Sequence, residues 1–210
     1  MIHILIADDH AILRRGLKEI LMGELEGTIF HEAGSAQHVL DQIQTHACDL
    51  LILDITMPGR SGLDLLRDLQ QLRPELPVLV LSMHPENQYA KRVLRAGAAG
   101  YMNKETAPKE LVKAVRKVLA GGRYVSAELA EKLAADLSAN DPRLPHERLS
   151  DREFEVVRMI ASGKTSSQIA EELHLSVTTV STYRARILEK MGMANNAELM
   201  RYAMHNKLIE

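Results

Sequence analysis

Five polar residues of the sequence have types that can act together in phosphoryl chemistry. They are Asp8, Asp9, Asp54, Ser82 and Lys104, and each lies at the end of an apolar run. Carboxylates that meet at one place repel unless a cation lies between them, and hard oxygen ligands with room for water suit Mg²⁺. A bound metal lets one carboxylate attack a phosphoryl group, while a lysine and a hydroxyl hold the phosphoryl oxygens. The pattern therefore predicts a magnesium site at which one aspartate is phosphorylated.

Single members of this set have simpler explanations. An aspartate that follows a strand is most often a turn residue or a helix cap, and this is the favoured explanation of Asp9 taken alone. Next to it, His10 is better explained as a solvated residue at a helix start than as a metal ligand. The spacing of His31, His38 and His46 is not typical of metal ligands, so we expect these three on the surface.

The elements that must position these residues alternate between strand and helix. Apolar runs predict strands at IHILIA, TIFHEA, DLLILDI, PVLVLSM and GYMNK, and an amphipathic helix follows each one. Such alternation with short connections predicts an α/β fold with a doubly wound, five-stranded parallel sheet. Sheets of this kind bind ligands at the carboxyl ends of the strands, which is where the five polar residues fall.

Two local features of the helices are also predicted. The first helix, AILRRGLKEILMG, is expected to place Ile12, Leu17 and Leu21 on one apolar side together with Leu13 and Ile20. The third helix, which begins near SGLDLL, is expected to open with a capping box formed by Ser61 and Asp64.

The composition narrows the class of protein. The 210 residues suffice for one large domain or for two small ones. A single cysteine excludes an intramolecular disulfide and fits a reducing environment. We see no signal peptide and no apolar run of about 18 residues, so we expect a cytoplasmic protein that does not enter a membrane. Because the formal net charge is −2, a surface for nucleic acid has to be a local patch.

A turn-rich segment with two prolines, SANDPRLPHER, separates a long first part from a short second part. We predict a first domain at residues 1–121, a linker with a helix at 122–147, and a small all-α domain at 148–210. The linker helix carries a leucine stripe that needs a partner surface, either on the first domain or on the second. The stripe consists of Leu129, Leu133 and Leu137.

The second domain is expected to hold a helix-turn-helix. Its helices are predicted at residues 151–162, 166–173, 177–191 and 196–206. Two capping boxes and one further cap begin them, at Ser150 with Glu153, Thr165 with Gln168, and Ser176. The tight turn HLS between the second and third helices has helix-turn-helix spacing.

The third of these helices has two different faces. Val177, Val180, Ile187 and Met191 are expected on the inner face. Small hydroxyl side chains and an arginine face outward, and they suit a DNA major groove. The segment from Ser176 to Lys207 also carries more basic than acidic residues. The DNA contacts are predicted at Lys164, Thr178, Thr179, Ser181, Thr182, Tyr183, Ala185, Arg186 and Lys190, while Arg184 falls on the inner side.

The first part resembles the receiver domain of two-component response regulators, a flavodoxin-like domain. The resemblance rests on ADDH at 7–10, LDITMPGRSG at 53–62, LSMH at 81–84 and GYMNK at 100–104. It implies that Asp54 accepts a phosphoryl group from a sensor histidine kinase. It further implies that Asp8, Asp9, Asp54 and the backbone carbonyl of Thr56 hold Mg²⁺. By the same resemblance, Lys104 and Ser82 grip the phosphoryl group, and Tyr101 is an aromatic switch residue.

The second part resembles the LuxR-type helix-turn-helix, through LSDREFEVV, IASGKTSSQIAEEL, LSVTTVSTYRARILEKMG and AELMRYA. The whole chain is therefore similar to NarL/FixJ-type response regulators. The resemblance implies a transcriptional regulator in which phosphorylation frees or dimerises the DNA-binding domain. The partners are then the kinase, double-stranded DNA, and a second copy when phosphorylated or DNA-bound. Ser181 and Tyr183 stand where the family often has lysine and histidine, so we expect fewer charged contacts to DNA.

Two other functions remain open on the sequence. The first is a phosphatase that works through an aspartyl-phosphate on a similar sheet. Such enzymes favour a second aspartate two residues after the nucleophile, where this chain has Thr56. The second is a flavodoxin-like electron carrier, for which a chain with no tryptophan and two phenylalanines is poorly equipped. For a regulator, we expect no enzymatic activity beyond slow self-dephosphorylation.

Overall fold

The chain folds into two compact units, Met1–Ala139 and Asn140–Glu210. The computed structural model describes residues 1–57, 62–84, 86–138 and 144–209. The predicted linker, residues 122–147, is divided between the units, because its helical part belongs to the first.

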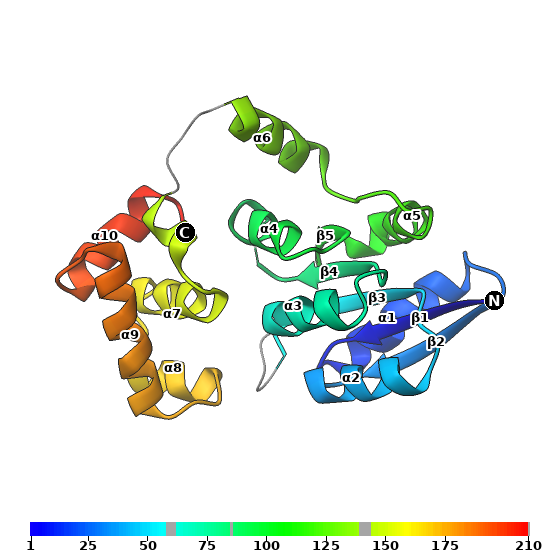
Figure 1. Cartoon of the computed structure of the whole chain (residues 1–210), viewed down its shortest axis with the longest axis horizontal. Coiled ribbons are helices and arrows are strands. Elements are labelled where there is room, and N and C mark those ends of the chain that lie inside the picture. Colours follow the sequence, from blue (N-terminus) through cyan, green and yellow to red (C-terminus); the bar gives the residue numbers. More distant parts are fainter. Residues whose placement is uncertain (58–61, 85, 139–143, 210) are drawn as a thin grey trace. The chain divides into compact units, whose positions relative to one another are not determined.

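The first unit is a five-stranded parallel sheet with strand order β2-β1-β3-β4-β5. Its strands are β1 (Ile2–Ala7), β2 (Thr28–Ala33), β3 (Leu50–Asp54), β4 (Val78–Ser82) and β5 (Gly100–Asn103). Its helices are α1 (Ala11–Met22), α2 (Ala36–Thr45), α3 (Gly62–Leu72), α4 (Glu86–Arg95) and α5 (Ala107–Leu119). Helices α1 and α5 pack on one face of the sheet, and α2, α3 and α4 lie on the other (Figure 1). The predicted doubly wound fold is confirmed.

The core of this unit is built from the strands that the sequence shows as apolar on both faces. Every residue of β3 and β4 is buried, as expected for central parallel strands covered on both sides. In α1, Leu17 and Leu21 are buried, but Ile12 is 90% exposed. The prediction for Ile12 was wrong because it lies nine positions before Leu21, which places it on the opposite side of a helix with about 3.6 residues per turn. Of the predicted capping box, Ser61 lies outside the described residues.

The linker is attached to the edge of this sheet. The N–H of Tyr124 donates to the carbonyl of Ala99, and the Tyr124 carbonyl accepts from the N–H of Tyr101. Helix α6 (Ala127–Ser138) follows, and Ser126 precedes it as a cap, because its hydroxyl accepts from the N–H of Leu129. Leu129 is buried and α6 contacts α4. The leucine stripe thus meets the first unit, with Leu133 half-buried and the Leu137 side chain outside the described part.

The second unit is helical. A short 3-10 helix (Pro145–Arg148) precedes α7 (Asp151–Ala161), α8 (Ser166–Glu172), α9 (Val177–Met191) and α10 (Asn196–His205). Both predicted capping boxes form, and Ser176 caps α9 by accepting from the N–H of Thr179. The four predicted helices are confirmed to within one residue at each end. None of the helices in the described part of the chain combines the length and the apolar character that crossing a membrane requires.

The inner face of α9 begins later than predicted. Val180 and Ile187 are fully buried and Met191 is 7% exposed, whereas Val177 is 48% exposed. Val177 is the first residue of α9, so its side chain lies at the end of the helix rather than within the packed interface.

An ion pair between Glu153 and Lys190 joins α7 to α9. Both Glu153 carboxylate oxygens lie 2.7–2.8 Å from the Lys190 ammonium, and one of them accepts from the Ser150 N–H. Burial acts to raise the pKa of the Glu153 carboxyl, but the contacts with Lys190 and Ser150 outweigh it and hold the pKa below its usual range. The ionised form is therefore favoured in the folded domain more than in the unfolded chain.

This ion pair predicts how stability depends on pH. A depressed pKa contributes stability above the unfolded value, about 4.3 for glutamate, and the contribution is lost as the pH falls below it. We expect α7 and α9 amides of the full chain to lose protection from hydrogen exchange in that range. Glu153→Gln keeps the capping geometry but should lose this component of the pH dependence. Glu171→Gln, at an exposed site on α8, should behave as the native chain; equal profiles for all three proteins would contradict the assignment.

Candidate functional site

Two buried carboxylates meet at the carboxyl end of the sheet. In the register of β1 with β3, Ala7 aligns with Leu53, so the next residues, Asp8 and Asp54, lie side by side. Each is only 1% exposed. The chain after Asp8 turns outward, which leaves Asp9 exposed beside them.

Lys104 brings a positive charge to this pair. Its N–H donates to the carbonyl of Ser82, which fixes the turn after β5. The Lys104 ammonium lies 2.6 Å from an oxygen of Asp8 and 2.7 Å from an oxygen of Asp54. The structure therefore brings together Asp8, Asp54 and Lys104, which follow or end three separate strands and which the sequence predicted to meet.

The charges of this group are incompletely balanced. Burial raises the pKa of the Asp54 carboxyl, and the nearby Lys104 ammonium only partly offsets this. Burial acts to lower the pKa of Lys104, but Asp54 and Asp8 outweigh it, so the pKa is raised and the lysine stays charged. One positive charge thus faces two buried carboxylates, and a further cation would favour ionised Asp54.

The residues present fit a hard divalent cation. Ligand atoms of Asp8, Asp9, His10 and Asp54 all lie within 4.8 Å of one another. The Asp8 Oδ2 atom is buried and accepts no hydrogen bond from the described residues, although Lys104 lies close to it as an ion-pair partner. Carboxylate oxygens of this kind are the ligands that Mg²⁺ prefers. The Thr56 N–H donates to Asp54 Oδ1 over 3.0 Å, which keeps this predicted residue beside the site.

Ser82 and Tyr101 connect the site to the start of α4. Ser82 is fully buried, and its hydroxyl accepts from the His84 N–H over 3.0 Å. Tyr101 is also fully buried, and its hydroxyl donates to the His84 carbonyl over 2.7 Å. The His84 ring stacks on Tyr89 of α4 with 4.4 Å between centroids. A displacement of Ser82 would therefore move His84, and with it the hydrogen bond of Tyr101 and the ring contact with α4.

Sequence reasoning missed the next contact outward from this segment. Glu86, the first residue of α4, accepts hydrogen bonds from the hydroxyl and the N–H of Ser126 at the start of α6. Neither residue belongs to a recognisable motif, so no signal in the sequence identifies the pair. The contact attaches the linker helix to the element that follows the candidate site.

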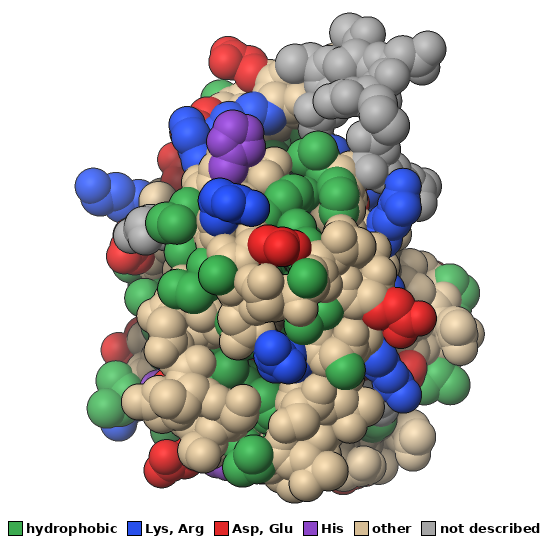
Figure 2. All heavy atoms as spheres, turned by 90° about the vertical axis from the view of Figure 1, so that its left-hand side faces the viewer, with side chains coloured by type: hydrophobic (Ala, Val, Ile, Leu, Met, Phe, Trp, Pro, Cys, Tyr) green, Lys and Arg blue, Asp and Glu red, His purple; other side chains and the backbone are tan. Residues whose placement is uncertain are grey.

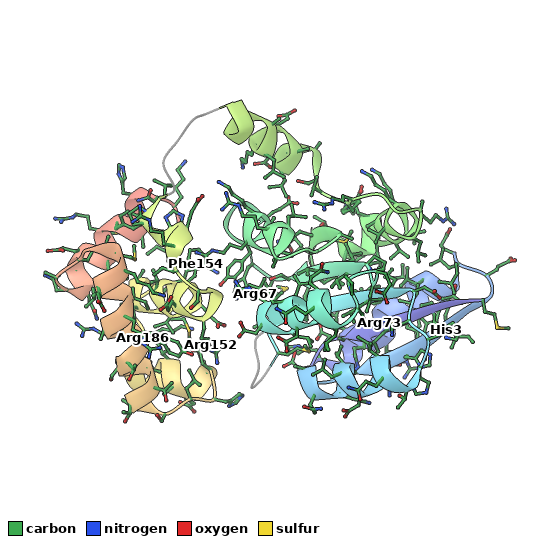
Figure 3. All side chains as sticks on the ribbon, viewed as in Figure 1. His3, Arg67, Arg73, Arg152, Phe154 and Arg186 are labelled. Atoms are coloured by element: carbon green, nitrogen blue, oxygen red, sulfur yellow. The ribbon has the colours of Figure 1, made fainter. Side chains whose placement is uncertain are left out.

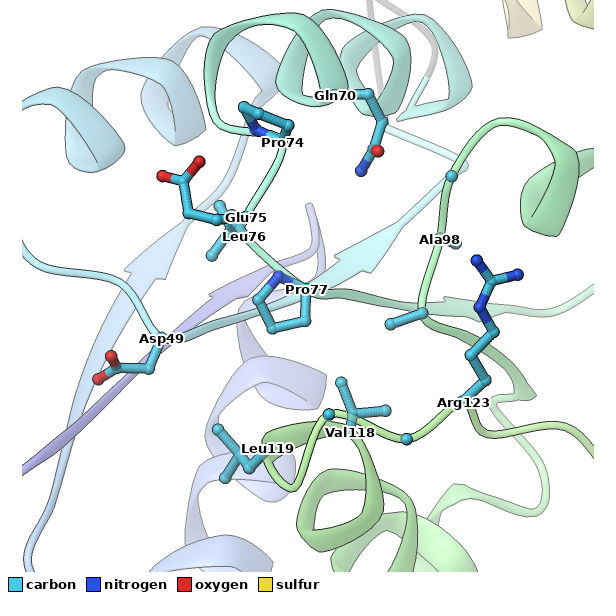
Figure 4. Close-up of a pocket in the computed structure, with 14 residues that line it drawn as sticks. Asp49, Gln70, Pro74, Glu75, Leu76, Pro77, Ala98, Val118, Leu119 and Arg123 are labelled. Carbon is cyan, nitrogen blue, oxygen red and sulfur yellow. The ribbon is translucent and has the colours of Figure 1, made fainter.

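A hollow at the other end of the sheet is separate from this site. It has a volume of about 470 Å³ and lies near the strand starts, between Asp49, Pro77, Val118 and Arg123 (Figure 4). It holds none of the five residues that predict phosphoryl chemistry.

In the helical domain, α9 presents its small polar side chains outward. Thr178, Ser181, Thr182 and Ala185 are exposed, and the hydroxyls of Ser181 and Thr182 donate to carbonyls one turn earlier. Arg186, marked in Figure 3, is exposed and has no polar partner within the described residues. Figure 2 shows basic side chains scattered over the left-hand face of Figure 1 rather than one continuous basic patch.

Other residues predicted at DNA lie differently. The Lys190 ammonium pairs with Glu153 and that of Lys164 pairs with Glu172, so both charges are already engaged within the domain. Thr179 and Tyr183 are half-buried. Arg184, which the helical wheel placed inward, is half-buried and donates to the side chain of Asn196 on α10. The outward surface of α9 whose side chains are exposed and not held in ion pairs is therefore smaller than the set of residues predicted to contact DNA.

Comparison with known proteins identifies both domains. Residues 4–116 match the response regulator receiver domain, and residues 147–203 match the luxR family of bacterial regulatory proteins. The chain belongs to the NarL/FixJ-family response regulators, in which a receiver domain is followed by a LuxR-type DNA-binding domain. These matches give no support to the phosphatase alternative.

Relatives match over nearly the whole length. The chain is 33% identical over 209 residues to the response regulator UvrY of Escherichia coli (strain K12), covering 99% of this chain and 96% of that protein. It is 38% identical over 210 residues to the transcriptional activator protein ExaE of Pseudomonas putida, with coverage of 98% and 97%. RcsB from Salmonella enterica serovar Typhimurium, solved bound to a promoter with a phosphomimetic, superposes with a TM-score of 0.65 at 28% identity, covering 96% of this chain and 98% of RcsB.

Proposed function

We propose that Asp54 accepts a phosphoryl group from a sensor histidine kinase and that this modification controls DNA binding by α8 and α9. The observation that carries the proposal is the geometry around Asp54. The Asp54 carboxylate is buried and lies 2.7 Å from the Lys104 ammonium, and Asp8 and Ser82 are also buried. The same chain carries a LuxR-type DNA-binding domain.

The phosphoryl step uses the side chains at the sheet edge. The Asp54 carboxylate attacks phosphorus, so an O–P bond forms while the N–P bond of a donor phosphohistidine breaks and the imidazole leaves. Asp8, Asp9, Asp54 and the carbonyl of Thr56 would hold Mg²⁺, which supplies neutralising charge when bound. Lys104 then exchanges a carboxylate oxygen for a phosphoryl oxygen, and the Ser82 hydroxyl donates to another. We expect only slow self-dephosphorylation and no turnover of other substrates.

The signal would leave the site through the segment around His84. A phosphoryl group adds a charge of roughly −1.5 to −2, and Ser82 and Lys104 turn toward it. Ser82 then releases or shifts the His84 N–H, and Tyr101 repacks as a switch because it holds the carbonyl of the same residue. The contact of Glu86 with Ser126 passes the change to the linker helix α6, and thereby frees the DNA-binding domain or allows it to dimerise.

DNA recognition is assigned to the outward face of α9. We propose contacts from Thr178, Thr179, Ser181, Thr182, Tyr183, Ala185 and Arg186, with Lys164 and Lys190 contributing only if they leave their partners. Two phosphorylated copies bind adjacent half-sites. Solved complexes of RcsB with DNA, at 26–28% identity, support this assignment. Because a histidine kinase domain and the chromosome are reached from the cytoplasm, we place the protein there.

Selection of bound DNA from a random pool tests this function. The full chain is incubated with Mg²⁺, with and without a small phosphodonor, and the enriched sequences are compared. We expect a short paired motif to be enriched strongly with the donor and weakly without it. Equal enrichment under both conditions would show that phosphorylation does not control binding.

Arg186 should contribute sequence discrimination. An arginine that reaches a base edge contributes about 1–3 kcal/mol, so Arg186→Ala should weaken binding to the selected site by about 5- to 150-fold and relax specificity at one position. Binding isotherms at several salt concentrations measure both effects. Arg15→Ala on α1, which removes an exposed arginine paired with Glu19, should bind as the native chain does. If both variants bind alike, Arg186 makes no contact.

A further inference from the structure

Three histidines that are far apart in the sequence meet on one face of the receiver sheet. The register of β1 with β2 aligns Leu5 with His31. Because side chains alternate along a strand, His3 shares the face of Leu5 and therefore that of His31. The rings of His3 and His31 are stacked with 5.7 Å between centroids, and His46, at the end of α2, brings its ring to 4.6 Å from that of His31. His46 is exposed, as predicted, and His31 is half-buried, but their rings are in contact although the sequence spacing gave no sign of it.

This cluster is separate from the phosphoacceptor site. His3 lies at the start of β1 and Asp8 follows its end, so the two are roughly 16 Å apart along a strand that rises about 3.3 Å per residue. His38, the remaining histidine of the group considered in the sequence, is exposed on α2 and contacts the side chain of Gln42 instead.

The spacing of the ring nitrogens matches that of ligands on one ion. His3 Nδ1 lies 3.4 Å from His31 Nε2. Zinc binds imidazole nitrogen at about 2.0–2.1 Å, so two ligands on a tetrahedral ion are about 3.3–3.4 Å apart. Imidazole nitrogen is also the commonest protein ligand of transition metals.

Two further polar contacts hold residues of this group in place. His46 Nδ1 lies 2.8 Å from the Thr45 hydroxyl, an outer partner of the kind that orients a ligating ring and leaves the other nitrogen available. The His3 N–H donates to the Asp49 carboxylate over 2.7 Å, which holds the backbone at this end of β1.

We propose that His3, His31 and His46 bind a divalent transition-metal ion, with Zn²⁺ as the expected ion. The His3 and His31 ring nitrogens are at hydrogen-bond distance from each other, and an ion would take the place of the proton between them once both rings tilt. The exposed His46 ring would complete the set by turning toward them. The ion would connect β1, β2 and the turn between α2 and β3, and water or an external ligand would fill the fourth position. This site is independent of phosphorylation at Asp54.

Competition between the protein and a chromophoric chelator for Zn²⁺ tests the site. The full chain is used without a histidine tag, and excess Mg²⁺ is added to occupy the acidic group. We expect one equivalent of Zn²⁺ to bind to the native chain, and a loss of at least about tenfold in affinity in His31→Gln and in His46→Gln. The second variant changes an exposed side chain, so it stays informative if the first fails to fold.

His38→Gln is the matched control because it removes an exposed histidine from the same helix. It should bind Zn²⁺ as the native chain does. The proposal is overturned if His46→Gln and His31→Gln retain native affinity. It is equally overturned if His10→Gln, rather than these two variants, removes the bound equivalent, because the ion then lies among the acidic residues.

Discussion

Asp54→Asn should abolish the response of the protein to a phosphodonor. The amide has the shape of the carboxylate but cannot attack phosphorus. Asp8 is equally buried and also contacts the Lys104 ammonium, but in the proposed site its carboxylate is a metal ligand rather than the acceptor. In the native chain we expect phosphorylation to raise affinity for the selected DNA by about 5–150-fold, the usual range of coupling between two sites. In the variant, affinity should stay at the unphosphorylated level, and no phosphoryl group should be incorporated.

The matched control for this variant is Asp41→Asn. Asp41 is exposed on α2 and accepts a hydrogen bond from Gln37, so its substitution should leave both the phosphoryl incorporation and the DNA response intact. DNA binding is measured for native, control and variant proteins with Mg²⁺, before and after addition of the donor. An Asp54→Asn protein that still gains affinity on treatment would show that the acceptor lies elsewhere.

Lys104→Met should strongly destabilise the receiver domain when Mg²⁺ is absent. The lysine side chain is 7% exposed and contacts two carboxylates that are almost fully buried. Removing one partner from a buried ion pair leaves uncompensated charge and costs about 3–5 kcal/mol. Urea denaturation of the full chain should therefore show a reduced free energy of unfolding for the receiver transition. Added Mg²⁺ should recover much of the loss, because a cation among the same carboxylates replaces the missing charge.

Lys113→Met provides the comparison for a surface lysine. Lys113 pairs with Glu110 at 3.3 Å and its side chain is 74% exposed, so the change should stay within about 0.5 kcal/mol. Two results would contradict the account of Lys104. One is a comparably small effect of Lys104→Met, and the other is a stabilisation by Mg²⁺ that is no larger in this variant than in the native chain.

The fold follows from the sequence because its local signals agree with one another. The short apolar runs at β3 and β4 have the two-sided apolar character that central parallel strands require, and the capping boxes at Ser150 and Thr165 define helix starts without tertiary information. The prediction for Ile12 failed where a run of apolar letters was taken as one helix face without following the turn angle. Its neighbours Leu17 and Leu21 obey that angle and are buried.

The candidate site divides in the same way. Asp8, Asp54 and Lys104 were predictable because parallel strands place their carboxyl ends at one edge. Contacts between side chains could not be predicted in this way. The ion pair of Lys190 with Glu153 depends on how α7 packs on α9, so the sequence alone does not show that the Lys190 ammonium already has a partner within the domain. The approach of His3 to His31 depends on the register of β1 with β2. The contact of Ser126 with Glu86 depends on the path that the linker takes after α5.

Mapping the phosphoryl group on the native chain tests the central claim most directly. The protein is treated with a small phosphodonor in the presence of Mg²⁺ or of a chelator, and the modified residue is located by mass spectrometry after reductive trapping of the acyl phosphate. The account predicts a single modification, on Asp54, that depends on the divalent ion. An unmodified Asp54 under both conditions, or a phosphoryl group on another residue, would contradict it.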